Sequence, residues 1–410
     1  MALYAFDGTW NLDEADDTQD TNVVRFKELY MGNNAEYVEG VGTRFGKLGH
    51  ALGGLFGSGG RTRIDEMYEE LCENWEHGDR VIDIIGFSRG AALAVHFANI
   101  IGEKGVKLSN GKVEQAQVRF LGVWDIVGSF GLSFDTFVNF QEINLGWHVD
   151  TVHQCVGHCF HAMALDERRE TFNVTLLDPD HQFGNIREVW FRGVHSDIGG
   201  GNTNVARSNI ALQWMLEQAR ACGLKFNETK AKLPRYSEVD RFAPISENQD
   251  VKLDPRRKIR DGDEIHPSAR PLDLAVGESH ACEVLAKSKY NWSGVSLRAG
   301  ASYTFSVPDG GTWEDASITC GPAGWQTEEL PWYKEGIVKA FEKHRRLKDA
   351  NWFALTGALS DEDKELFLIG DKTDAYTAPH DADLYLFAND MPSKYGNNQG
   401  SLMVTITRTG

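Results

Sequence analysis

The feature that most constrains the fold is a serine placed between an apolar run and a helix-forming run. Residues 81–85 (Val-Ile-Asp-Ile-Ile) lead into 86–90 (Gly-Phe-Ser-Arg-Gly), and 91–95 (Ala-Ala-Leu-Ala-Val) follow at once. This is the succession of strand, sharp turn and helix that exposes a nucleophilic serine at the end of a buried strand. The helix also directs its first amide groups at negative charge developing on a substrate. Ser88 is therefore the predicted nucleophile, and the alternative is a serine that only caps the helix.

The pattern around this turn predicts an α/β domain. From residue 1 to about 220, apolar runs alternate with stretches of helical periodicity, which favours a parallel sheet with helices on both faces. The predicted strands are 3–6, 37–41, 80–85, 118–124 and 188–194, and the predicted helices are 63–75 and 209–221, the second ended by Gly223.

The remainder of the chain has a different pattern. Residues 225–275 are rich in charge and proline, which indicates surface loops, whereas beyond about 280 short alternating runs indicate strands. The predicted strands are 302–307, 366–369, 384–387 and 402–406, with one helix around 335–344. The predicted fold is thus an α/β-hydrolase-like catalytic domain over 1–278, followed by an all-β sandwich domain over 279–410.

A serine hydroxyl becomes a nucleophile when an imidazole takes its proton and a carboxylate orients that imidazole. In this fold class the acid and then the histidine follow the serine, each after a later strand. Asp125 ends the run 120–124 and His195 ends the run 189–194, so they are the predicted acid and base. Asp197 is the rival acid, and His161, placed before a predicted helix, is the rival base.

The oxyanion hole requires two backbone N–H groups, one of them from the residue after the nucleophile. Arg89 holds that position, and the loop after the first strand, which contains Gly8 and Thr9, is the candidate for the second donor. Asp7 has two further interpretations, binding a metal and orienting this loop. The chemistry needs no cofactor.

Composition limits the partners and the compartment. Lys and Arg number 42 against 60 Asp and Glu, and the resulting net charge of -18 opposes nucleic-acid binding, which requires clustered cations. No apolar stretch approaches the ~20 residues of a membrane span. The N-terminus lacks the pattern of a secretory signal, which predicts synthesis in the cytoplasm and leaves export by a signal-independent machine open. Cys155 and Cys159 lie among histidines, but a metal site there is disfavoured by their spacing.

Five segments carry a family resemblance, namely 6–11, 86–91, 122–125, 164–169 and 188–201. In this order, over about residues 1–275, they resemble the phospholipase effectors of bacterial type VI secretion systems and their α/β-hydrolase relatives. The resemblance implies hydrolysis of membrane phospholipid esters by a triad at Ser88, Asp125 and His195, and export by a contact-dependent secretion system. Known effectors of this type carry membrane-anchoring or delivery modules, and no segment here has the amphipathic character expected of an anchor.

The C-terminal segment 385–401 combines a strand, an oxygen-rich turn and another strand. Asp390, Asn397 and Asn398 offer hard oxygen ligands suited to Ca²⁺, and a solvated turn is the alternative. Together with 282–286 and 351–357, the segment resembles the calcium-dependent galactose-binding lectins of bacteria. The resemblance implies a β-sandwich in which these three side chains, the carbonyl of Lys394 and one from an earlier loop near Trp313 bind Ca²⁺. A galactose-type glycan is then a candidate ligand.

The sequence as a whole predicts a serine esterase of the lipase or phospholipase type that forms an acyl-enzyme on Ser88. Its substrate is a lipid or another ester, and the lectin-like domain holds the enzyme near a glycan-bearing or membrane surface. Two alternatives stay open. One is a hydrolase of a non-lipid ester or polyester, and the other is a carbohydrate-binding protein with an inactive hydrolase domain.

Overall fold

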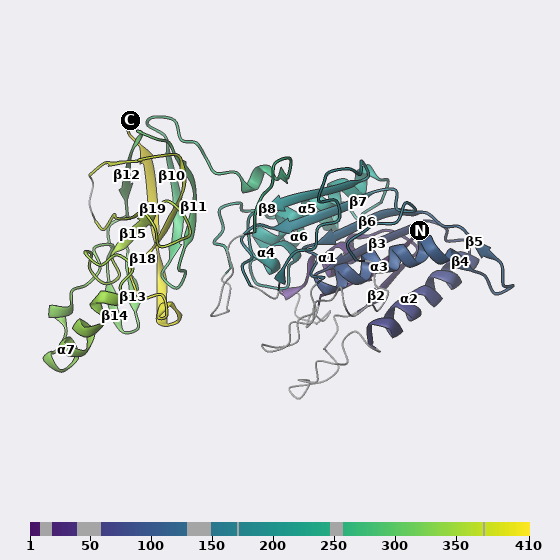
Figure 1. The fold of residues 1–410 in the computed structure, drawn as a ribbon, viewed down its shortest axis with the longest axis horizontal. Helices are drawn as coiled ribbons and strands as arrows, with labels where there is room; N and C mark the ends of the chain where they lie inside the picture. The colour runs from purple at the N-terminus through teal and green to yellow at the C-terminus, as the bar shows by residue number, and fades with distance from the viewer. Residues whose placement is uncertain (9–18, 39–58, 129–148, 170–171, 247–256, 372–373) are drawn as a thin grey trace. The chain divides into compact units, whose positions relative to one another are not determined.

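The computed structural model describes residues 1–8, 19–38, 59–128, 149–169, 172–246, 257–371 and 374–410 (Figure 1). The chain forms two compact units. The first consists of Met1–Arg241 and Asn248–Ala269, and the second of Phe242–Glu247 and Arg270–Gly410. Ser279, where the second domain is predicted to begin, is the first residue of the first strand of the second unit.

The first unit is built on a parallel β-sheet (Figure 1). Within the described ranges its strand order is β2-β1-β3-β6-β7-β8-β9, and each neighbouring pair is parallel. The strands are β1 (Ala2–Phe6), β2 (Asn34–Val38), β3 (Ile82–Phe87), β6 (Val118–Trp124), β7 (Cys159–Ala164), β8 (Ile186–Phe191) and β9 (Glu264–Ile265), with a separate hairpin of β4 (Val106–Lys107) and β5 (Val113–Glu114). The helices are α1 (Asn22–Leu29), α2 (Gly59–Glu76), α3 (Arg89–Lys104), α4 (His195–Gly199), α5 (Val205–Ala221) and α6 (Pro234–Ser237).

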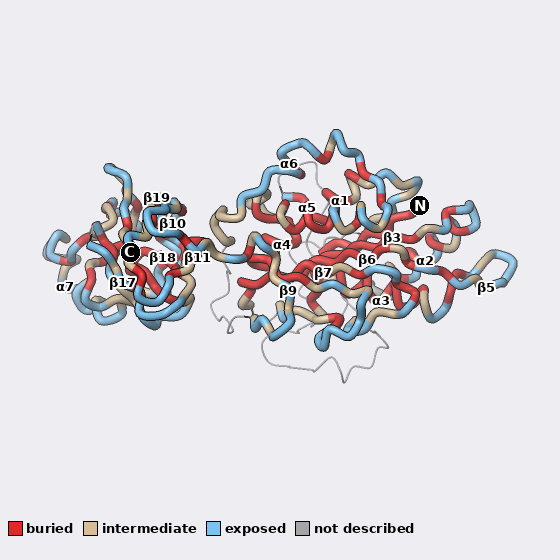
Figure 2. The backbone as a smooth tube through the Cα atoms, turned by 90° about the horizontal axis from the view of Figure 1, so that it is seen from above, coloured by how far each residue is buried: buried red, intermediate tan, exposed pale blue. Residues whose placement is uncertain are grey.

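Each face of this sheet has its own apolar core, because successive side chains of a strand point to opposite faces. Tyr4 and Phe6 of β1 pack in the core formed with α2 and α3, whereas Leu3 and Ala5 pack in the core formed with α1 and α5. The strands β1, β3, β6 and β7 are buried along most of their length (Figure 2). The predicted fold class is confirmed for this unit, with helices on both faces of a parallel sheet.

One element of the first unit differs in type from its prediction. Residues 161–166 are predicted to be helix-like, but Cys159–Ala164 forms β7, paired in parallel with β6 and β8. The prediction was wrong because β7 is covered on both faces, so its sequence lacks the apolar–polar alternation that marks a half-buried strand. The predicted strand at 37–41 overlaps β2, and its residues 39–41 lie outside the described residues.

The second unit contains two antiparallel sheets. One has the order β14-β13-β19-β12-β17 with β10 also paired to β19, and the other has the order β11-β18-β15-β16. The strands are β10 (Ser279–Leu285), β11 (Asn291–Leu297), β12 (Ser302–Ser306), β13 (Trp313–Asp315), β14 (Ile318–Cys320), β15 (Leu355–Ala358), β16 (Leu366–Leu368), β17 (Tyr376–Thr377), β18 (Ala382–Ala388) and β19 (Asn398–Arg408), and the helix is α7 (Trp332–Phe341).

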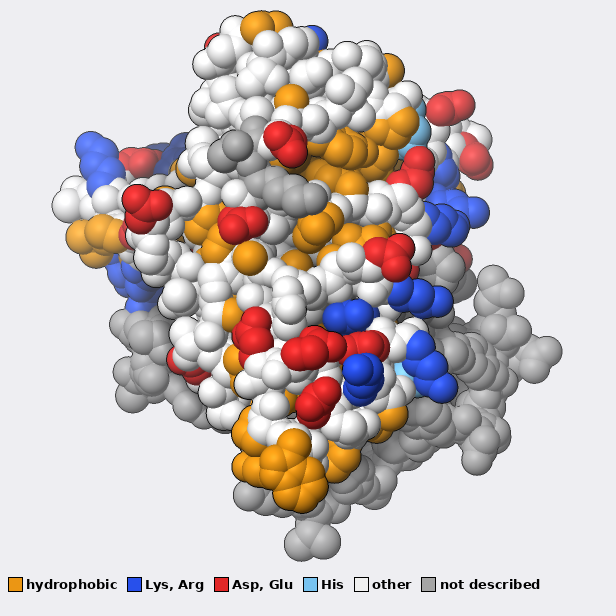
Figure 3. Space-filling model, turned by 90° about the vertical axis from the view of Figure 1, so that its left-hand side faces the viewer, with side chains coloured by type: hydrophobic (Ala, Val, Ile, Leu, Met, Phe, Trp, Pro, Cys, Tyr) orange, Lys and Arg blue, Asp and Glu red, His pale blue; other side chains and the backbone are white. Residues whose placement is uncertain are grey.

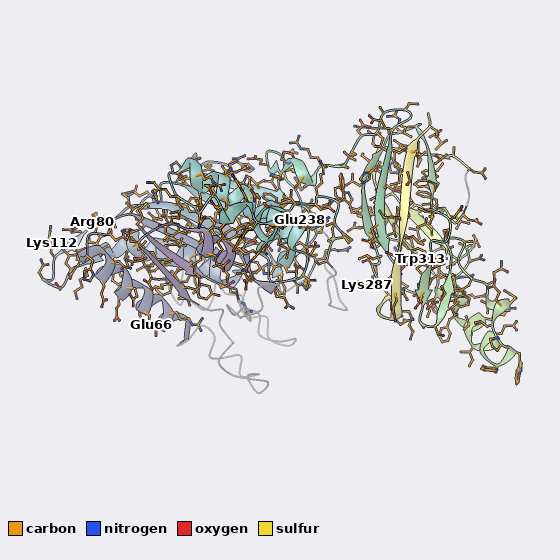
Figure 4. All side chains as sticks on the ribbon, turned by 180° about the vertical axis from the view of Figure 1, so that it is seen from behind. Glu66, Arg80, Lys112, Glu238, Lys287 and Trp313 are labelled. Atoms are coloured by element: carbon orange, nitrogen blue, oxygen red, sulfur yellow. The ribbon has the colours of Figure 1, made fainter. Side chains whose placement is uncertain are left out.

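The two sheets enclose the core of the second unit. Trp313, labelled in Figure 4, is buried and packs edge-on against Phe353 with 5.7 Å between ring centroids. The predicted all-β character of this region is confirmed. None of the helices in the described ranges of the chain combines the length and the apolar character needed to span a bilayer.

Candidate active site

Ser88 lies in the turn between β3 and α3 with φ 59° and ψ -124°, a conformation that a residue with a Cβ adopts only under constraint. Two glycines allow the turn. A Cβ on Gly86 would lie 2.7 Å from the carbonyl oxygen of Gly90, and a Cβ on Gly90 would overlap the carbonyl oxygens of Phe6 and Asp7. The Ser88 side chain makes no capping hydrogen bond to α3, so the structure does not favour a helix-capping serine.

Asp125 and His195 meet beside this turn. Asp125 directly follows β6 and His195 is the first residue of α4. Nδ1 of His195 lies 2.6 Å from Oδ2 of Asp125, and both side chains are buried. When Nδ1 carries the proton shared with the carboxylate, Nε2 keeps its lone pair and can accept another proton. The pair therefore has the arrangement of an oriented general base.

Three contacts bring Ser88 to the same edge of the sheet. Its N–H donates to the carbonyl of Trp124 (3.0 Å), and its carbonyl accepts from the N–H of Val127 (3.3 Å), which ties the turn to the end of β6. The ring of Phe87 packs on the His195 imidazole with 4.6 Å between centroids. The structure thus brings Asp125 and His195 into contact and places Ser88 in the turn at the neighbouring end of β3.

Arg257 joins the site without a prediction from the sequence. Its Nη1 donates to Oδ1 of Asp125 at 2.6 Å and its Nη2 to Oδ2 at 3.2 Å. The same guanidinium donates to the carbonyl oxygens of Ala164 (2.7 Å) and Phe172, and the Arg257 side chain is only 9% exposed. Burial alone would raise the pKa of Asp125, but the charges of Arg257 and His195 hold that pKa well below its ordinary range. The ionised form of Asp125 is therefore favoured over the protonated form near neutral pH.

The segment after β7 fixes the backbone of His195. Glu167 accepts the N–H of His195 at 3.1 Å and is itself paired with Arg169 at 2.8 Å. Phe172 packs edge-on against the imidazole, 4.8 Å between centroids, and the Arg169 guanidinium lies over the Phe172 ring, 3.7 Å from its centroid. The imidazole is thus in contact with two aromatic rings, which limit its rotation.

The two rivals have other partners. His161 lies in β7 rather than before a helix, where Nδ1 pairs with Glu188 at 2.8 Å and Nε2 accepts the N–H of Ile126 at 3.2 Å. Both ring nitrogens are therefore engaged in supporting the loop after β6. Asp197 lies in the first turn of α4, where it accepts the N–H of Val194 at 3.1 Å. Its carboxylate serves the start of that helix.

The predicted oxyanion donors have different outcomes. Arg89 is the first residue of α3, where the backbone N–H has no acceptor within the helix, and burial lowers the pKa of its guanidinium to about 10. The N–H of Gly8 donates to Oδ1 of Asp7 at 2.6 Å, so it is directed at that carboxylate. Thr9 lies outside the described residues. Asp7 also accepts the hydroxyls of Thr21 and Tyr37, which favours its interpretation as a residue that orients the loop.

A second polar cluster lies in the C-terminal unit. The amide nitrogen of Asn398 donates to Oδ2 of the buried Asp390 at 3.1 Å, while Oδ1 of Asn398 is buried without a hydrogen-bond partner. Asp315, on the neighbouring strand β13, accepts from Asn397 at 3.3 Å. Burial and then the charge of Asp390 raise the pKa of Asp315 to about 6. The Lys394 carbonyl accepts the N–H of Asn397 at 3.2 Å.

Two properties of this cluster suit a hard cation. An unpartnered buried amide oxygen has a vacant acceptor site. Two neighbouring carboxylates, the buried Asp390 and the half-buried Asp315, repel each other unless a positive charge lies between them. Lys394 is exposed, and its ammonium lowers the pKa of Asp390 against the larger raising effect of burial. The predicted ligands Asp390 and Asn398 are in contact, whereas Asp315 is a carboxylate that the sequence pattern did not single out.

Comparison with known proteins follows the division into two units. The family model described as "T6SS, Phospholipase effector Tle1-like, catalytic domain" matches residues 3–115 and 107–218, more than half of the chain. An uncharacterized protein from Pseudomonas aeruginosa is similar at 22% identity, covering 58% of this chain and 48% of that one, with a TM-score of 0.41. The Tle1 effector, solved bound to the VgrG spike of the type VI secretion system, is similar at 23% identity, 49% and 51% coverage and a TM-score of 0.37.

The C-terminal part has a separate likeness. The N-terminal domain of EclA, a PllA-like lectin, is similar at 22% identity, covering 31% of this chain and 94% of that one, with a TM-score of 0.23. The chain spans about half the length of the Pseudomonas protein and of Tle1. No curated protein matches the chain.

Proposed function

We propose that this chain, which belongs to the Tle1-like phospholipase effector family of type VI secretion through its catalytic domain, hydrolyses carboxylic esters of membrane phospholipids. One observation carries the proposal. The buried His195–Asp125 pair, 2.6 Å apart, adjoins a serine held in a strained turn at the end of β3. A strained serine beside an oriented imidazole is the arrangement that acyl transfer requires. Family membership supplies the phospholipid as the substrate class.

In the proposed reaction, Oγ of Ser88 attacks the ester carbonyl while Nε2 of His195 takes the hydroxyl proton. The oxyanion of the tetrahedral intermediate accepts a hydrogen bond from the backbone N–H of Arg89, and the positive end of the α3 dipole stabilises its charge. His195 then returns the proton to the departing alcohol oxygen, which leaves an acyl group on Ser88. Water, deprotonated by the same imidazole, attacks this acyl-enzyme and releases the fatty acid.

Asp125 keeps its charge throughout this cycle. Its four donors, including Ala164 N–H at 2.9 Å and the Arg257 guanidinium, hold the carboxylate in one position. A fixed, ionised carboxylate selects the Nδ1–H tautomer of His195 and stabilises the imidazolium that forms in each half-reaction. Export by a contact-dependent secretion system is part of the same proposal and rests on the family match.

A second candidate function is calcium-dependent sugar binding by the C-terminal unit. The unpartnered Oδ1 of Asn398 next to Asp390 supports it. Asp390, Asn397 and Asn398 would hold Ca²⁺ through side chains, with Asp315 as a further carboxylate and Lys394 through its carbonyl. Bound there, Ca²⁺ would supply a hard cation that coordinates sugar hydroxyls, a galactose-type glycan being the ligand that the lectin resemblance implies.

Mass-spectrometric lipid analysis tests the enzyme proposal. Phospholipid vesicles are incubated with wild type, with Ser88→Ala and with the control Ser109→Ala, which removes the hydroxyl of an exposed residue of the β4–β5 hairpin. We expect wild type and control to release fatty acid and lysophospholipid, and Ser88→Ala to be slower by at least about a thousandfold.

Other results of these experiments would support one of the two alternative functions. Cleavage of soluble short-chain esters with intact vesicle lipids would transfer the activity to a non-lipid ester. Failure of a fluorophosphonate probe to label wild-type Ser88, together with Ca²⁺-dependent binding of galactosides, would instead identify a carbohydrate-binding protein with an inactive hydrolase domain.

A further inference from the structure

The helix α7 of the C-terminal unit has an apolar face exposed to solvent. Trp332 is 85% exposed, Tyr333 58%, Ile337 64% and Phe341 46%. Exposed large hydrophobic side chains elsewhere in the described chain occur singly in sequence, whereas these four lie within one ten-residue helix. Figure 3 shows the hydrophobic surface that gathers at this end of the unit. We call these four residues the α7 face.

The geometry of the helix groups the four side chains. At 3.6 residues per turn they fall within about half of the helix circumference, with Gly336 and Ala340 between them. On the opposite side, Val338 is partly buried against the core of the unit, as is Leu330 just before the helix. Because the inner side of the helix is fixed by this packing, the α7 face is held outward.

Basic residues accompany the α7 face in a chain that is acidic as a whole. Residues 335–349 contain five Lys or Arg against three Asp or Glu, whereas the whole chain has 42 against 60. Lys339, Lys343 and Lys348 are exposed, and Lys339 lies 3.9 Å from the equally exposed Glu328, a pair that solvent screens. Arg346 is an exception, because its buried guanidinium pairs with Asp363 at 2.7 Å. An anionic surface would therefore meet local attraction here despite the net charge of -18.

We propose that the α7 face docks the enzyme on an anionic phospholipid bilayer, with α7 lying in the plane of the interface. Trp and Tyr favour the boundary between headgroups and acyl chains, where their rings are buried and their polar atoms stay hydrated. A short helix with aromatic residues on one face and lysines beside it binds at that boundary without crossing it. This proposal stands against the expectation from the sequence that no segment of the chain has the amphipathic character of a membrane anchor.

This inference rests on the proposed lipase activity for its biological role but not for its test. A docked enzyme meets lipid at a high local concentration, so docking raises hydrolysis of vesicle lipid and leaves hydrolysis of a soluble ester unchanged. An unidentified protein partner, or a second copy of this chain, is the competing occupant. The lysines beside the aromatic residues favour the lipid surface.

Vesicle co-sedimentation with the full chain tests the proposal. Ser88→Ala serves as the background so that the vesicles stay intact, and phosphatidylcholine vesicles are compared with vesicles that also contain phosphatidylglycerol. In this background, the double substitution Trp332→Ser with Ile337→Ser, called the α7 variant below, should weaken binding to the anionic vesicles by at least about tenfold. The reason is that the burial of two large apolar side chains in the bilayer is lost. Lys339→Glu should weaken it by roughly fivefold or more, and only on vesicles with phosphatidylglycerol.

Val276→Ser is the matched control, since Val276 is 64% exposed in a turn of the same unit. It should bind as the background does. All the changed side chains are exposed, and circular dichroism verifies that each variant is folded. Equal vesicle binding by the α7 variant and by the Ser88→Ala background overturns the proposal. A dimer that light scattering detects without vesicles, and that the α7 variant disrupts, overturns it as well.

The esterase activity of chains that carry the same substitutions but keep Ser88 separates the docking proposal from the proposed lipase function. We expect the α7 variant to lose vesicle hydrolysis and to keep its rate on p-nitrophenyl butyrate. Vesicle binding through α7 by a chain without esterase activity would refute the proposed function alone. Unchanged hydrolysis of vesicle lipid by the α7 variant would refute the docking role alone.

Discussion

Replacement of Arg257 by Met removes the guanidinium that binds both oxygens of Asp125 while keeping most of the side-chain volume. Asp125 is fully buried, so the loss leaves a carboxylate with only the His195 imidazole and the Ala164 N–H as donors. Breaking a buried ion pair costs about 3–5 kcal/mol, and the two remaining donors favour the lower end of that range. At about 3 kcal/mol, the unfolding midpoint of the first unit should fall by roughly 6–12 °C.

The pH dependence of this loss has a definite sign. The pKa of Asp125 lies below its ordinary value of 3.8 in the folded wild type, so the pair stabilises the fold above about that pH. This stabilisation disappears as the pH falls through the lowered pKa. The difference in midpoint between wild type and Arg257→Met should therefore be largest near neutrality and should shrink below about pH 4.

Differential scanning fluorimetry between about pH 2.5 and 8 measures the stability, and hydrolysis of p-nitrophenyl butyrate measures the activity of the site. A displaced carboxylate misaligns His195, so kcat should fall roughly ten- to a hundredfold. The control is Arg260→Met, which removes a 35% exposed arginine paired with Asp263 at 3.0 Å and should cost at most about 1 kcal/mol. Equal midpoints and equal kcat for Arg257→Met and wild type would refute a role for this arginine in positioning Asp125.

Four further predictions concern the proposed catalytic acid, the turn and, for two of them, the C-terminal cluster. Asp125→Asn should lower kcat by about 10⁴-fold by stabilising the wrong His195 tautomer, whereas Asp197→Asn should mainly reduce thermal stability. If steady-state kinetics show the larger loss of kcat for Asp197→Asn, Asp197 is the catalytic acid. Gly90→Ala should destabilise the first unit by about 1–3 kcal/mol in urea unfolding, because a Cβ overlaps the end of β1; a midpoint unchanged from wild type would contradict that contact. Asp315, whose pKa is raised to about 6, should make the metal-free C-terminal unit less stable as the pH rises from 4 to 7, by about 2 kcal/mol at most. Asp315→Asn should reduce this slope in thermal scans with EDTA, and the raised pKa of Asp390 should account for part of what remains. Calorimetry should detect Ca²⁺ binding by wild type and none by Asp390→Ala, and equal binding by both would exclude the proposed ligand set.

The periodicity of apolar residues identified the helices and strands that have one side in the core and the other side in solvent. The amphipathic helix predicted at 63–75 lies within α2, and the alternating run predicted at 402–406 lies within β19. Such patterns are local, because each side chain's environment repeats with the geometry of its own element. The strand β7 was misassigned for the opposite reason, since burial on both faces removes the alternation.

The sequence by itself determined the serine turn, because glycine spacing, the apolar run and the following helix lie within fifteen residues. It also suggested Asp125 and His195, since parallel strands end at one edge of the sheet and residues that follow them meet there. Their catalytic roles stay predictions.

Only the tertiary structure decided which groups surround that site. Arg257 reaches Asp125 across 132 positions of sequence, and Glu167 binds the His195 backbone across 28. No local pattern encodes such contacts, because they depend on where separate loops come together in the fold. The exposed face of α7 is of the same kind: its composition is local, but its orientation follows from the packing of Val338 against a core built from distant strands.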